Sequence, residues 1–336
     1  MFSSPSYVGV DAGSESIKIV ELSRKGKQHI LKGCGVFPLS DLTAKIFQET
    51  LHVAFKSLKI KAKEIAISVP GQYSIVRYLD FPKMPPAQLQ EALRFEASKY
   101  IPYALDATIY DYAVLSDNDP KATMQRILLA AVKKEVVFQR LKLFEDAGFM
   151  VKLVDVSSFS LLNLFLNALG KDWAEEGAVA LLNLGHSYTD IIIIARTVPC
   201  FTRTIQVGAR HFDEIIAAAF GVGADEARKT RQSSSLSDQK IATVVDTVQG
   251  KLAKEVKLSF DFYENQSGQQ ITKMYLAGGM SYDTAFCEAF AQSLGAKLQH
   301  WNVMAHIIYG PAVNKAAVES NANQLAVAAG LALRKI

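Results

Sequence analysis

The sequence is poor in cysteine and lacks a long apolar run that is free of polar residues. The three cysteines, Cys34, Cys200 and Cys287, are too widely spaced for a metal knuckle or a disulfide framework. The most apolar stretches, AVALLNLGHSYTDIIIIA and FSLLNLFLNALG, are interrupted by Asn, Gly, His and Asp before they reach the roughly 20 residues of a membrane-spanning helix. We therefore expect a protein of the reducing cytoplasm that meets a membrane only through other proteins.

Charge of one sign is also not in marked excess. Lys and Arg number 37 and Asp and Glu 33, a balance that does not favour nucleic acid or a polyanionic substrate. The basic runs Ser23 to Lys27 and Lys56 to Lys63 could face anionic lipid, although such runs more often lie in solvated turns and helix faces. The N-terminal residues lack the basic and apolar regions of a signal peptide. Hydrophobic residues make up 49% of the sequence, which predicts a folded protein. Its 336 residues are enough for two domains.

Two stretches of the chain predict β-hairpins of the same design. VGVDAGSESIKIVEL, residues 8–22, places Asp, Gly and Ser between two runs rich in β-branched residues. VALLNLGHSYTDIIII, residues 179–194, repeats this pattern, with Asn183 in the position of Asp11. A further turn, MYLAGGMS, follows a short apolar strand and precedes a predicted helix. One half of the chain thus echoes the other.

The segment between the hairpins has a different pattern. FPKMPPAQLQEALRFEASKYIPY predicts a helix that ends at Pro102, with Leu89, Leu93, Ala97 and Tyr100 along one face. Extended stretches and an amphipathic helix follow, so we predict a compact α+β module of about seventy residues inserted in the first half.

The second half contains a mainly helical stretch. Its pattern predicts helices broken at Gly221 and at the Ser-rich segment Ser233 to Ser237, with a long last helix from about Ser237 to Tyr263.

The chemistry of the turns points to a phosphate site. A tight turn can aim several backbone N–H groups into one concavity, and Gly13 permits close approach of a ligand while Ser14 and Ser16 add hydroxyl donors. The Asp11 carboxylate beside a phosphate is repulsive unless a cation such as Mg²⁺ or its water shell lies between them. One such turn alone is more often an ordinary capped hairpin, but two turns and a Gly-Gly turn together favour a nucleotide enclosed in a central cleft.

These motifs resemble the phosphate 1, phosphate 2 and adenosine motifs of the actin-like ATPase superfamily. Within it, the chain is most similar to the PilM family of type IV pilus assembly, whose architecture is related to that of the division protein FtsA. The resemblance covers nearly the whole chain, and it rests most specifically on LRFEASKYIPYALDATIYDYAVL, since the Asp-x-Gly and Gly-Gly turns are shared across the superfamily.

The resemblance implies an α/β protein of the actin-like ATPase (ribonuclease H-like) fold, with two duplicated halves around a nucleotide cleft. It implies a first half, subdomain 1A, of residues 1–80, completed by 151–176 and a C-terminal helix within 312–336. Residues 81–150 would form the inserted FtsA-like subdomain 1C. Residues 177–311 would form the second half, subdomains 2A and 2B, with 2B at about 213–271.

The resemblance also implies ATP and Mg²⁺ as ligands, with a set of binding residues. Asp11 is expected to hold the metal. The expected nucleotide-binding residues are Asp11, Gly13, Ser14, Ser16, Lys18, Asn183, Gly185, Thr189, Lys254, Ser259, Gly278 and Gly279. The family pattern has Asp where Asn183 stands, and an amide adds no charge and cannot act as a base. We therefore expect nucleotide binding with little or slow hydrolysis and assign no catalytic residue.

The partner implied by the resemblance is the cytoplasmic N-terminal tail of PilN, received between subdomains 1A and 1C. Tyr100, Pro102, Tyr103 and Tyr110 are candidates for such a peptide groove, although aromatic residues at helical spacing are equally often core. Other pilus platform proteins and the motor ATPases are further possible partners. This implies a cytoplasmic adaptor that is peripheral at the inner membrane.

Alternatives remain at this stage. A GspL-like scaffold of type II secretion and an FtsA-like filament-forming ATPase share parts of the pattern, and a kinase would need a second carboxylate as a base. His186 lies in the second turn, where we expect its side chain to point to solvent. QLAVAAGLALRKI is rich in Ala and Gly, which favours close packing in a core over a membrane-binding helix.

Overall fold

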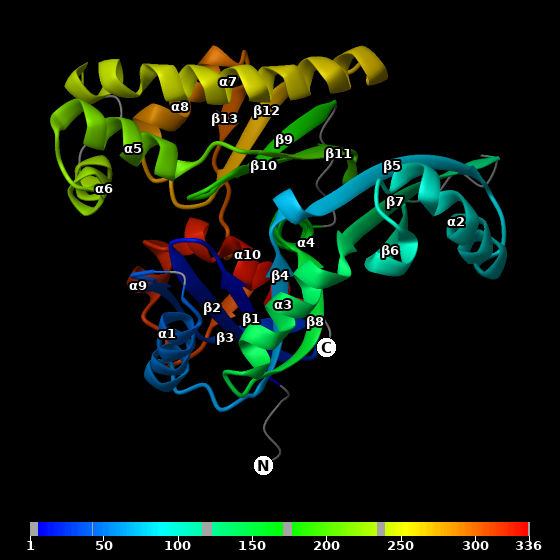
Figure 1. Cartoon of the computed structure of the whole chain (residues 1–336), viewed down its shortest axis with the longest axis horizontal. Helices are drawn as coiled ribbons and strands as arrows, with labels where there is room; N and C mark the ends of the chain where they lie inside the picture. The colour runs from blue at the N-terminus through cyan, green and yellow to red at the C-terminus, as the bar shows by residue number, and fades with distance from the viewer. Residues whose placement is uncertain (1–5, 42, 116–122, 171–176, 234–238, 335–336) are drawn as a thin grey trace.

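The computed structural model of the protein describes residues 6–41, 43–115, 123–170, 177–233 and 239–334 (Figure 1). Its largest sheet has six strands in the order β14-β3-β2-β1-β4-β8. These strands are β1 (Ser6–Ala12), β2 (Ser16–Lys25), β3 (Gln28–Pro38), β4 (Glu64–Val69), β8 (Met150–Val156) and β14 (Ile307–Tyr309). β1, β2 and β3 form an antiparallel meander, while β4 and β8 run parallel to β1.

A second sheet of five strands repeats this topology in the order β11-β10-β9-β12-β13. Its strands are β9 (Ala178–Leu184), β10 (Thr189–Ala195), β11 (Val198–Ile205), β12 (Ile271–Ala277) and β13 (Lys297–Gln299). Here too, an antiparallel meander is followed by strands parallel to its first member. Both predicted hairpins are confirmed, β1–β2 and β9–β10, and the echo in the sequence corresponds to two halves with one topology.

A third sheet, of three strands in the order β5-β7-β6, projects from the first half (Figure 1). It consists of β5 (Ser74–Pro82), β6 (Thr108–Leu115) and β7 (Met124–Lys133), with the short helices η1 (Gly71–Tyr73) and η2 (Leu105–Ala107) preceding β5 and β6. Helix α2 (Pro86–Tyr100) covers one face through Leu89, Leu93 and Ala97, as the helical spacing predicted.

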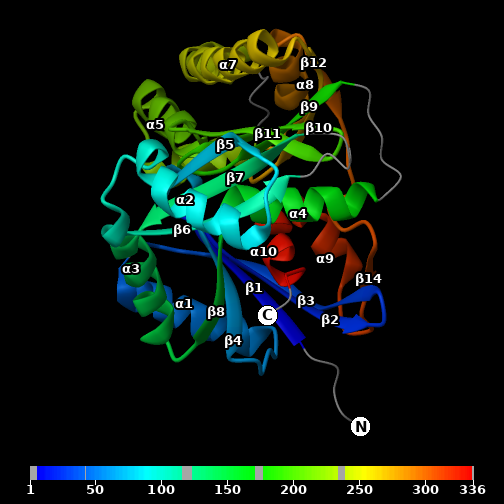
Figure 2. The same cartoon turned by 90° about the vertical axis from the view of Figure 1, so that its right-hand side faces the viewer.

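The helices complete a layered arrangement around the two large sheets (Figure 2). α1 (Ala44–Ser57) and α3 (Lys134–Glu145) pack on one face of the six-stranded sheet, and α4 (Ser157–Leu169) and α10 (Ala322–Ala332) lie between the two sheets. The outer face of the five-stranded sheet is covered by α5 (Ala209–Phe220), α6 (Ala224–Ser233), α7 (Gln239–Ser267) and α8 (Thr284–Ser293). The short α9 (Lys315–Glu319) precedes α10.

Small residues allow α10 to enter the centre of the molecule. A Cβ on Gly9 of β1 would collide with the α10 backbone at Ala328, and a Cβ on Gly330 of α10 would collide with the Ser160 carbonyl of α4. Residues from Leu325 to Ala332 of α10 are buried. The Ala- and Gly-rich sequence is therefore a core helix, as predicted.

The packing of the inserted unit differs at both ends from the predicted range 81–150. β5, which begins at Ser74, already belongs to the three-stranded sheet, whereas α3 packs on the first sheet. Phe144 of α3 is fully buried there, with its ring edge-on to Phe47 of α1 at a centroid distance of 5.1 Å. The described residues that pack as one body are thus 74–115 and 123–133.

The long helix α7 also ends later than predicted. Its predicted start at Ser237 lies outside the described residues, and it ends at Ser267 instead of Tyr263. Gly268, with φ of +68°, is the first residue that favours leaving the helix, and its N–H donates to the Glu264 carbonyl at 2.8 Å. In the described part of the chain, no helix is both long and apolar enough to cross a membrane.

Candidate functional site: a polar cleft and an apolar groove

The tip of hairpin β1–β2 forms one side of a cleft between the two halves. The Gly13 N–H donates to the Ser16 carbonyl at 3.1 Å, which closes the turn. Lys18 Nζ lies 3.8 Å from Asp11 Oδ2 and donates to the Ser16 carbonyl at 3.3 Å. A Cβ on residue 13 would lie 2.9 Å from Lys18 Nζ, so glycine gives this cation its place over the turn.

A partly buried arginine from α3 supports the same tip from behind. Arg140 donates to the Ser68 carbonyl at 2.5 Å and to the Ala12 carbonyl at 2.7 Å. Burial lowers the pKa of this guanidinium, and the nearby Asp11 carboxylate opposes that shift. Nothing in the local sequence indicated this role, because Arg140 lies 128 residues from the turn that it holds.

The tip of hairpin β9–β10 forms the opposite side and is capped by a helix. The first N–H groups of α5 donate to it, from Ala209 to the Gly185 carbonyl at 3.0 Å and from Arg210 to the His186 carbonyl at 2.8 Å. A Cβ on Gly208 would lie 2.7 Å from the Gly185 carbonyl oxygen. The close approach of α5 to the turn therefore depends on glycine at position 208.

The two hairpin tips touch through polar side chains. Ser14 Oγ lies 2.7 Å from Ser187 Oγ and 3.1 Å from His186 Nδ1. The prediction that His186 points to solvent is therefore wrong: the ring is half-buried and faces the first hairpin. Burial lowers the pKa of His186, with Glu15 and Asp213 acting in the opposite direction, so the ring is mainly neutral at neutral pH.

The Gly-Gly turn after β12 closes the third side of the cleft. Gly278 has φ of +92°, and a Cβ there would lie 2.8 Å from Asn183 Oδ1, so the turn contacts the second hairpin directly. The Gly278 N–H donates to the Asn323 carbonyl, near the start of α10, at 2.9 Å. By contrast, a Cβ on Gly279 would meet nothing within 4 Å. Gly279 thus borders open space inside the cleft.

Two connected cavities occupy the cleft. A recess of about 70 Å³ lies among the three turns, lined by residues that include Asp11, Ser14, Lys18 and Asn183. A larger cavity of about 340 Å³ continues from it toward α6 and shares Glu15, Ser16, Gly185, His186, Gly279 and Gln324 with the recess. Arg228 of α6 lines the larger cavity and pairs with Glu15 of the first tip at 3.1 Å.

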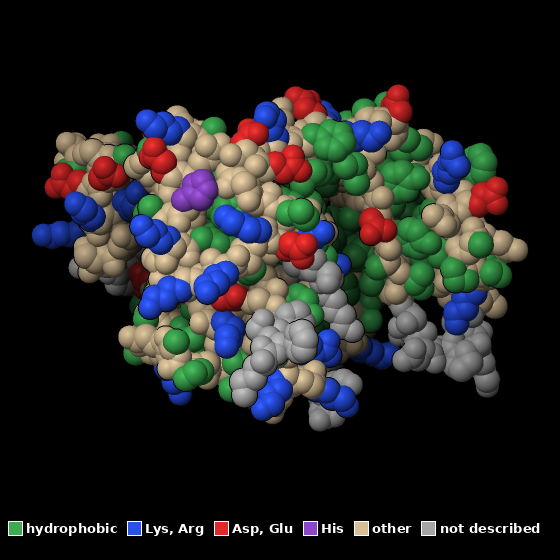
Figure 3. All heavy atoms as spheres, turned by 90° about the horizontal axis from the view of Figure 1, so that it is seen from below, with side chains coloured by type: hydrophobic (Ala, Val, Ile, Leu, Met, Phe, Trp, Pro, Cys, Tyr) green, Lys and Arg blue, Asp and Glu red, His purple; other side chains and the backbone are tan. Residues whose placement is uncertain are grey.

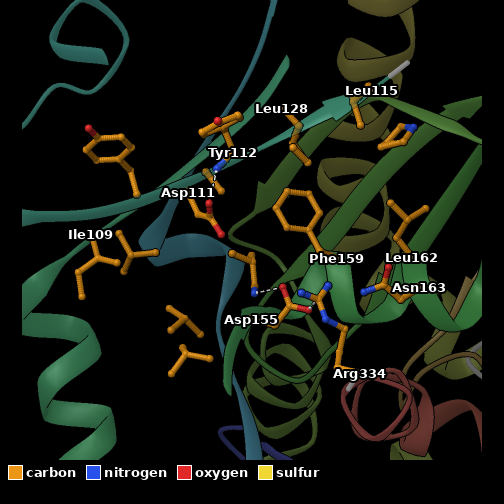
Figure 4. Close-up of a pocket in the computed structure, with 18 of the residues that line it drawn as sticks. Ile109, Asp111, Tyr112, Leu115, Leu128, Asp155, Phe159, Leu162, Asn163 and Arg334 are labelled. Atoms are coloured by element: carbon orange, nitrogen blue, oxygen red, sulfur yellow. Dashed lines mark hydrogen bonds and ion pairs between the residues drawn. The ribbon is translucent and has the colours of Figure 1, made fainter. Parts of the chain in front are cut away.

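A separate apolar groove of about 470 Å³ lies between the inserted unit and the first half (Figure 4). On one side it is lined by β6 and β7, with Ile109, Ala113 and Leu128, and on the other by α4, with Phe159 and Leu162. β6 is an edge strand of its sheet, since it pairs with β7 alone among the described strands. The groove can therefore offer main-chain hydrogen bonds as well as apolar contacts.

Three polar side chains, Asp155, Asn163 and Arg334, also line this groove (Figure 4). Asp155 Oδ2 lies 3.4 Å from Arg334 Nη1, and burial raises the pKa of Asp155 while the arginine opposes the shift. Asn163 Nδ2 is buried and has no hydrogen-bond acceptor among the described residues. A ligand of this groove thus meets a free amide donor within an apolar lining.

The four predicted groove residues have different positions. Tyr110 lines the groove. Tyr100 packs partly buried against the core of the inserted unit, whereas Pro102 and Tyr103 are exposed, with Lys133 Nζ 4.3 Å above the Tyr103 ring. The residues of α4 were missed by the sequence reasoning, because that helix lies elsewhere in the chain.

Comparison with known proteins decides the family. The family model described as "Type IV pilus assembly protein PilM" matches residues 9–336. The chain belongs to the PilM family. Among solved structures, the chain is similar to one titled "PilM-PilN type IV pilus biogenesis complex", with TM-score 0.86, 22% identity and 98% coverage of both chains.

Two other solved structures share the fold at lower similarity. The ethanolamine utilization protein EutJ from Carboxydothermus hydrogenoformans has TM-score 0.58 and 16% identity, with 99% of this chain and 90% of that chain covered. MreB 5 of Spiroplasma citri, solved bound to AMPPNP, has TM-score 0.53 and 10% identity, with 98% of this chain and 95% of that chain covered. The predicted actin-like ATPase fold with two α/β halves is confirmed.

Asn183 has a structural partner within its own hairpin. Asn183 is the cross-strand partner of Asp190, and its side chain donates a hydrogen bond to the Asp190 carboxylate. Asp190 is fully buried and also accepts from Thr204 Oγ1 at 2.6 Å and from Ser157 Oγ at 3.3 Å. Burial raises its pKa to about 6. A second carboxylate at position 183 would repel this one at close range.

Three predicted binding residues lie away from the cleft. Thr189 is fully buried and donates its hydroxyl to the Val207 carbonyl at 2.8 Å, so it fixes the hairpin instead of facing a ligand. Lys254 is exposed on α7, and Ser259 is buried beside Arg203 at 3.1 Å. Neither Lys254 nor Ser259 lines the described cavities, because α7 covers the outer face of the second sheet.

The remaining predicted residues come together in the cleft and fit Mg²⁺ and a nucleotide. Asp11, Gly13, Ser14, Ser16, Lys18, Asn183, Gly185, Gly278 and Gly279 all line the small recess. Two carboxylates line it: Asp11, with hydroxyl and amide groups around it, and Glu15, which is paired with Arg228 at 3.1 Å. In the described part of the chain, no three His, Cys, Asp or Glu side chains gather as a metal cluster. This donor set suits Mg²⁺, which keeps several waters and takes few protein ligands.

Proposed function

We propose that this protein is an ATP-binding adaptor of the type IV pilus inner-membrane platform, which holds the cytoplasmic N-terminal tail of PilN and changes its affinity for partners with nucleotide state. One observation carries the proposal: the first half borders both a polar cleft and an apolar groove, and one helix lines both. Ser157, at the start of α4, lines the recess, while Phe159 and Leu162 of the same helix line the groove.

The groove supports an extended peptide as its ligand. Its volume of about 470 Å³ accommodates several side chains, and its edge strand β6 can add a further strand by main-chain hydrogen bonds. The similar structure titled as a PilM-PilN complex makes PilN the partner to test. Asn163 would then donate a hydrogen bond to an oxygen of the bound tail. This bond would fix the position of the peptide along the apolar groove.

The cleft supports a nucleotide with Mg²⁺. The turn with Lys18 suits the phosphates, and the cavity of about 340 Å³ next to Gly279 suits the nucleoside. Asp11 would hold the metal through its water shell, and the metal would neutralise the phosphates against this carboxylate. The related fold of MreB 5, solved with AMPPNP, is consistent with this placement.

The same geometry favours slow turnover. Asn183 cannot accept a proton, and the Asp190 oxygens are already engaged by Thr204, Ser157 and Asn183. Asp190 also does not line the recess. We therefore assign no general base and propose that nucleotide binding, more than hydrolysis, sets the state of the adaptor.

The proposed location follows from the proposed partner. Bound to the cytoplasmic tail of PilN, the protein would lie in the cytoplasm and be peripheral at the inner membrane. Other platform proteins and the motor ATPases are further proposed partners, with no surface assigned to them.

Titration with a peptide copying the tail of the cognate PilN tests the groove. Ala113→Trp should fill the groove beside β6 and weaken binding by more than tenfold, since Ala113 is an exposed groove residue. Ala87→Trp, an exposed position on α2 outside the groove, is the matched control. Equal affinity of the wild type and Ala113→Trp would contradict the assignment.

A titration with Mg·ATP tests the cleft separately. Gly279→Val should fill the open space and abolish nucleotide binding while the free energy of unfolding changes little, because its Cβ meets no protein atom within 4 Å. Gly250→Val, with equally free space on α7, controls for the loss of a glycine. Nucleotide binding that survives Gly279→Val would exclude this cleft as the site.

A further inference from the structure

Lysine side chains gather at one edge of the six-stranded sheet. β1 is antiparallel to β2 and parallel to β4 and β8, so the β2–β3 turn and the starts of β4 and β8 lie at the same edge. This edge is opposite to the end of β1 that carries Asp11. Five exposed lysines lie there, on the turn and on the segment leading into β4, and we name them the basal lysines: Lys25, Lys27, Lys59, Lys61 and Lys63.

The basal lysines are not neutralised by neighbouring carboxylates. Glu64 pairs with Lys152 at 3.2 Å, and Asp146 pairs with Lys142 at 2.9 Å. Within the ranges that the structure describes, none of the five basal lysines forms an ion pair. Figure 3, which views the molecule from this end, shows several blue side chains in the left and lower middle part of the face, with red ones beside them. The edge therefore presents free positive charge.

An exposed apolar side chain lies among these charges. Met150, the first residue of β8, is 54% exposed, and its N–H donates to the Lys63 carbonyl at 2.8 Å. The preceding residue, Phe149, is buried, and Lys63 Nζ lies 4.7 Å from the centroid of its ring. A long, flexible thioether beside several lysines combines the two contacts of an interfacial membrane surface, electrostatic and apolar.

We propose that the basal lysines and Met150 form a docking surface for a membrane that carries anionic headgroups. The lysines would lie at the level of the lipid phosphates and Met150 would enter the interface between headgroups and acyl chains. This inference goes beyond the proposed function and does not depend on it. The two agree in geometry, because Figure 3 shows an apolar hollow on the same face, between the first half and the inserted unit.

The chemistry of this surface favours lipid over nucleic acid. Most cations at this edge are lysines, which act as flexible point charges, whereas readout of nucleic acid typically uses the planar fork of Arg and stacking on aromatic rings. Arg24, at the same turn, is partly buried, and its Nε donates to the Gly26 carbonyl at 2.9 Å. The nearby ring of Phe149 is buried and so cannot stack on a base. Lipid headgroups require only net positive charge on a broad face, which the edge provides.

Vesicle flotation of the full chain tests this inference. We expect the wild type to float with phosphatidylcholine vesicles containing about one third phosphatidylglycerol and to remain in solution with phosphatidylcholine alone. Changing Lys25, Lys27 and Lys61 together to Gln should weaken the flotation by about 100-fold in apparent affinity, since each lysine adds roughly fivefold near an anionic surface. Met150→Ser should weaken it by about threefold with no change of charge.

The matched control removes three exposed lysines from the opposite half. Changing Lys251, Lys257 and Lys297 to Gln lowers the net charge by the same amount and should leave flotation unchanged. Equal flotation with neutral vesicles, or an equal loss in both triple variants, would overturn the proposal. Tight binding of duplex DNA without any binding of anionic vesicles would also overturn it. Titration of the tail peptide is independent of these outcomes, so the failure of either proposal can be recognised separately.

Discussion

The two hairpins that face each other across the cleft share a backbone pattern, but their charges are arranged in opposite ways. In the first, the Asp11 carboxylate lies at the cleft, with Lys18 Nζ 3.8 Å away and the partly buried Arg140 behind the turn. In the second, the cleft side is the neutral amide of Asn183, and the carboxylate of Asp190 lies buried behind it.

This difference assigns different tasks to two related turns. The first keeps its carboxylate partly exposed among cations, where it can meet a ligand. The second uses its carboxylate internally, to join Asn183 with Thr204 and the start of α4 at Ser157. The two halves therefore share the turn, whereas the position of the charge differs between them: only the first turn presents a carboxylate to the cleft, and there our proposal places the metal.

The largest expected effect comes from the cation behind the first hairpin. Arg140→Met should lower the free energy of unfolding by about 4 kcal/mol, because it leaves the Ser68 and Ala12 carbonyls without their charged donor. Urea unfolding measures this. Arg210→Met, which removes an exposed arginine paired with Glu214, should change the stability by less than about 1 kcal/mol. Similar losses in both variants would contradict the structural role of Arg140.

The buried carboxylate of the second hairpin should make stability depend on pH. Its folded pKa is raised from 3.8 to about 6, so the protonated form stabilises the fold below pH 4, and this contribution is lost as pH rises through 6. Relative to Asp190→Asn, the wild type should lose on the order of 3 kcal/mol of unfolding free energy between pH 4 and pH 8. Parallel pH profiles for the two proteins would show that Asp190 keeps an ordinary pKa.

An acid at position 183 sharpens the comparison. Asn183→Asp should lower the free energy of unfolding at pH 8 by about 2 kcal/mol, since a hydrogen bond to a buried carboxylate is replaced by repulsion. The double change Asn183→Asp with Asp190→Asn exchanges the partners and should recover most of that loss. If the double variant is as unstable as the sum of the single ones, the two side chains are not coupled.

The smallest effect concerns the contact between the tips. Ser14→Ala removes the hydrogen bond to Ser187, at 2.7 Å, and should lower the free energy of unfolding by about 1 kcal/mol. Ser293→Ala, which removes a local hydroxyl bond within α8, is the control for a serine outside the cleft. A gain in stability for Ser14→Ala would mean that the tips are strained when they touch.

Much of the fold could be predicted from local pattern, because strand and turn signals lie next to each other in the chain. The β-branched runs around Asp11 and Asn183 predicted both hairpins, and the small residues of α10 predicted a core helix. The recess could be predicted as well, because the hydroxyl, amide and N–H groups that line it belong to the turns themselves. These features depend on residues that are close in the sequence, and the periodicity of apolar residues reveals such local structure.

What could not be predicted depends on contacts between distant segments. Arg140 and Asp190 acquire their roles from partners elsewhere in the chain, and no local pattern marks a buried charge. The position of Lys254 and Ser259 away from the described cavities could not be predicted, because helical periodicity gives one apolar face but not which side of the sheet the helix covers. The boundary at 81–150 failed to match the packing because α3 follows β7 directly yet packs on another sheet.

The central claim, that the cleft and the groove communicate, is tested most directly by one calorimetric experiment. A peptide copying the PilN tail is titrated into the protein with and without Mg·ATP, and the same pair of titrations is repeated with Gly279→Val. The account predicts an affinity that changes at least fivefold with nucleotide in the wild type and not at all in the variant. Peptide affinity that is the same with and without bound nucleotide would contradict the claim and leave a groove that acts independently of the cleft.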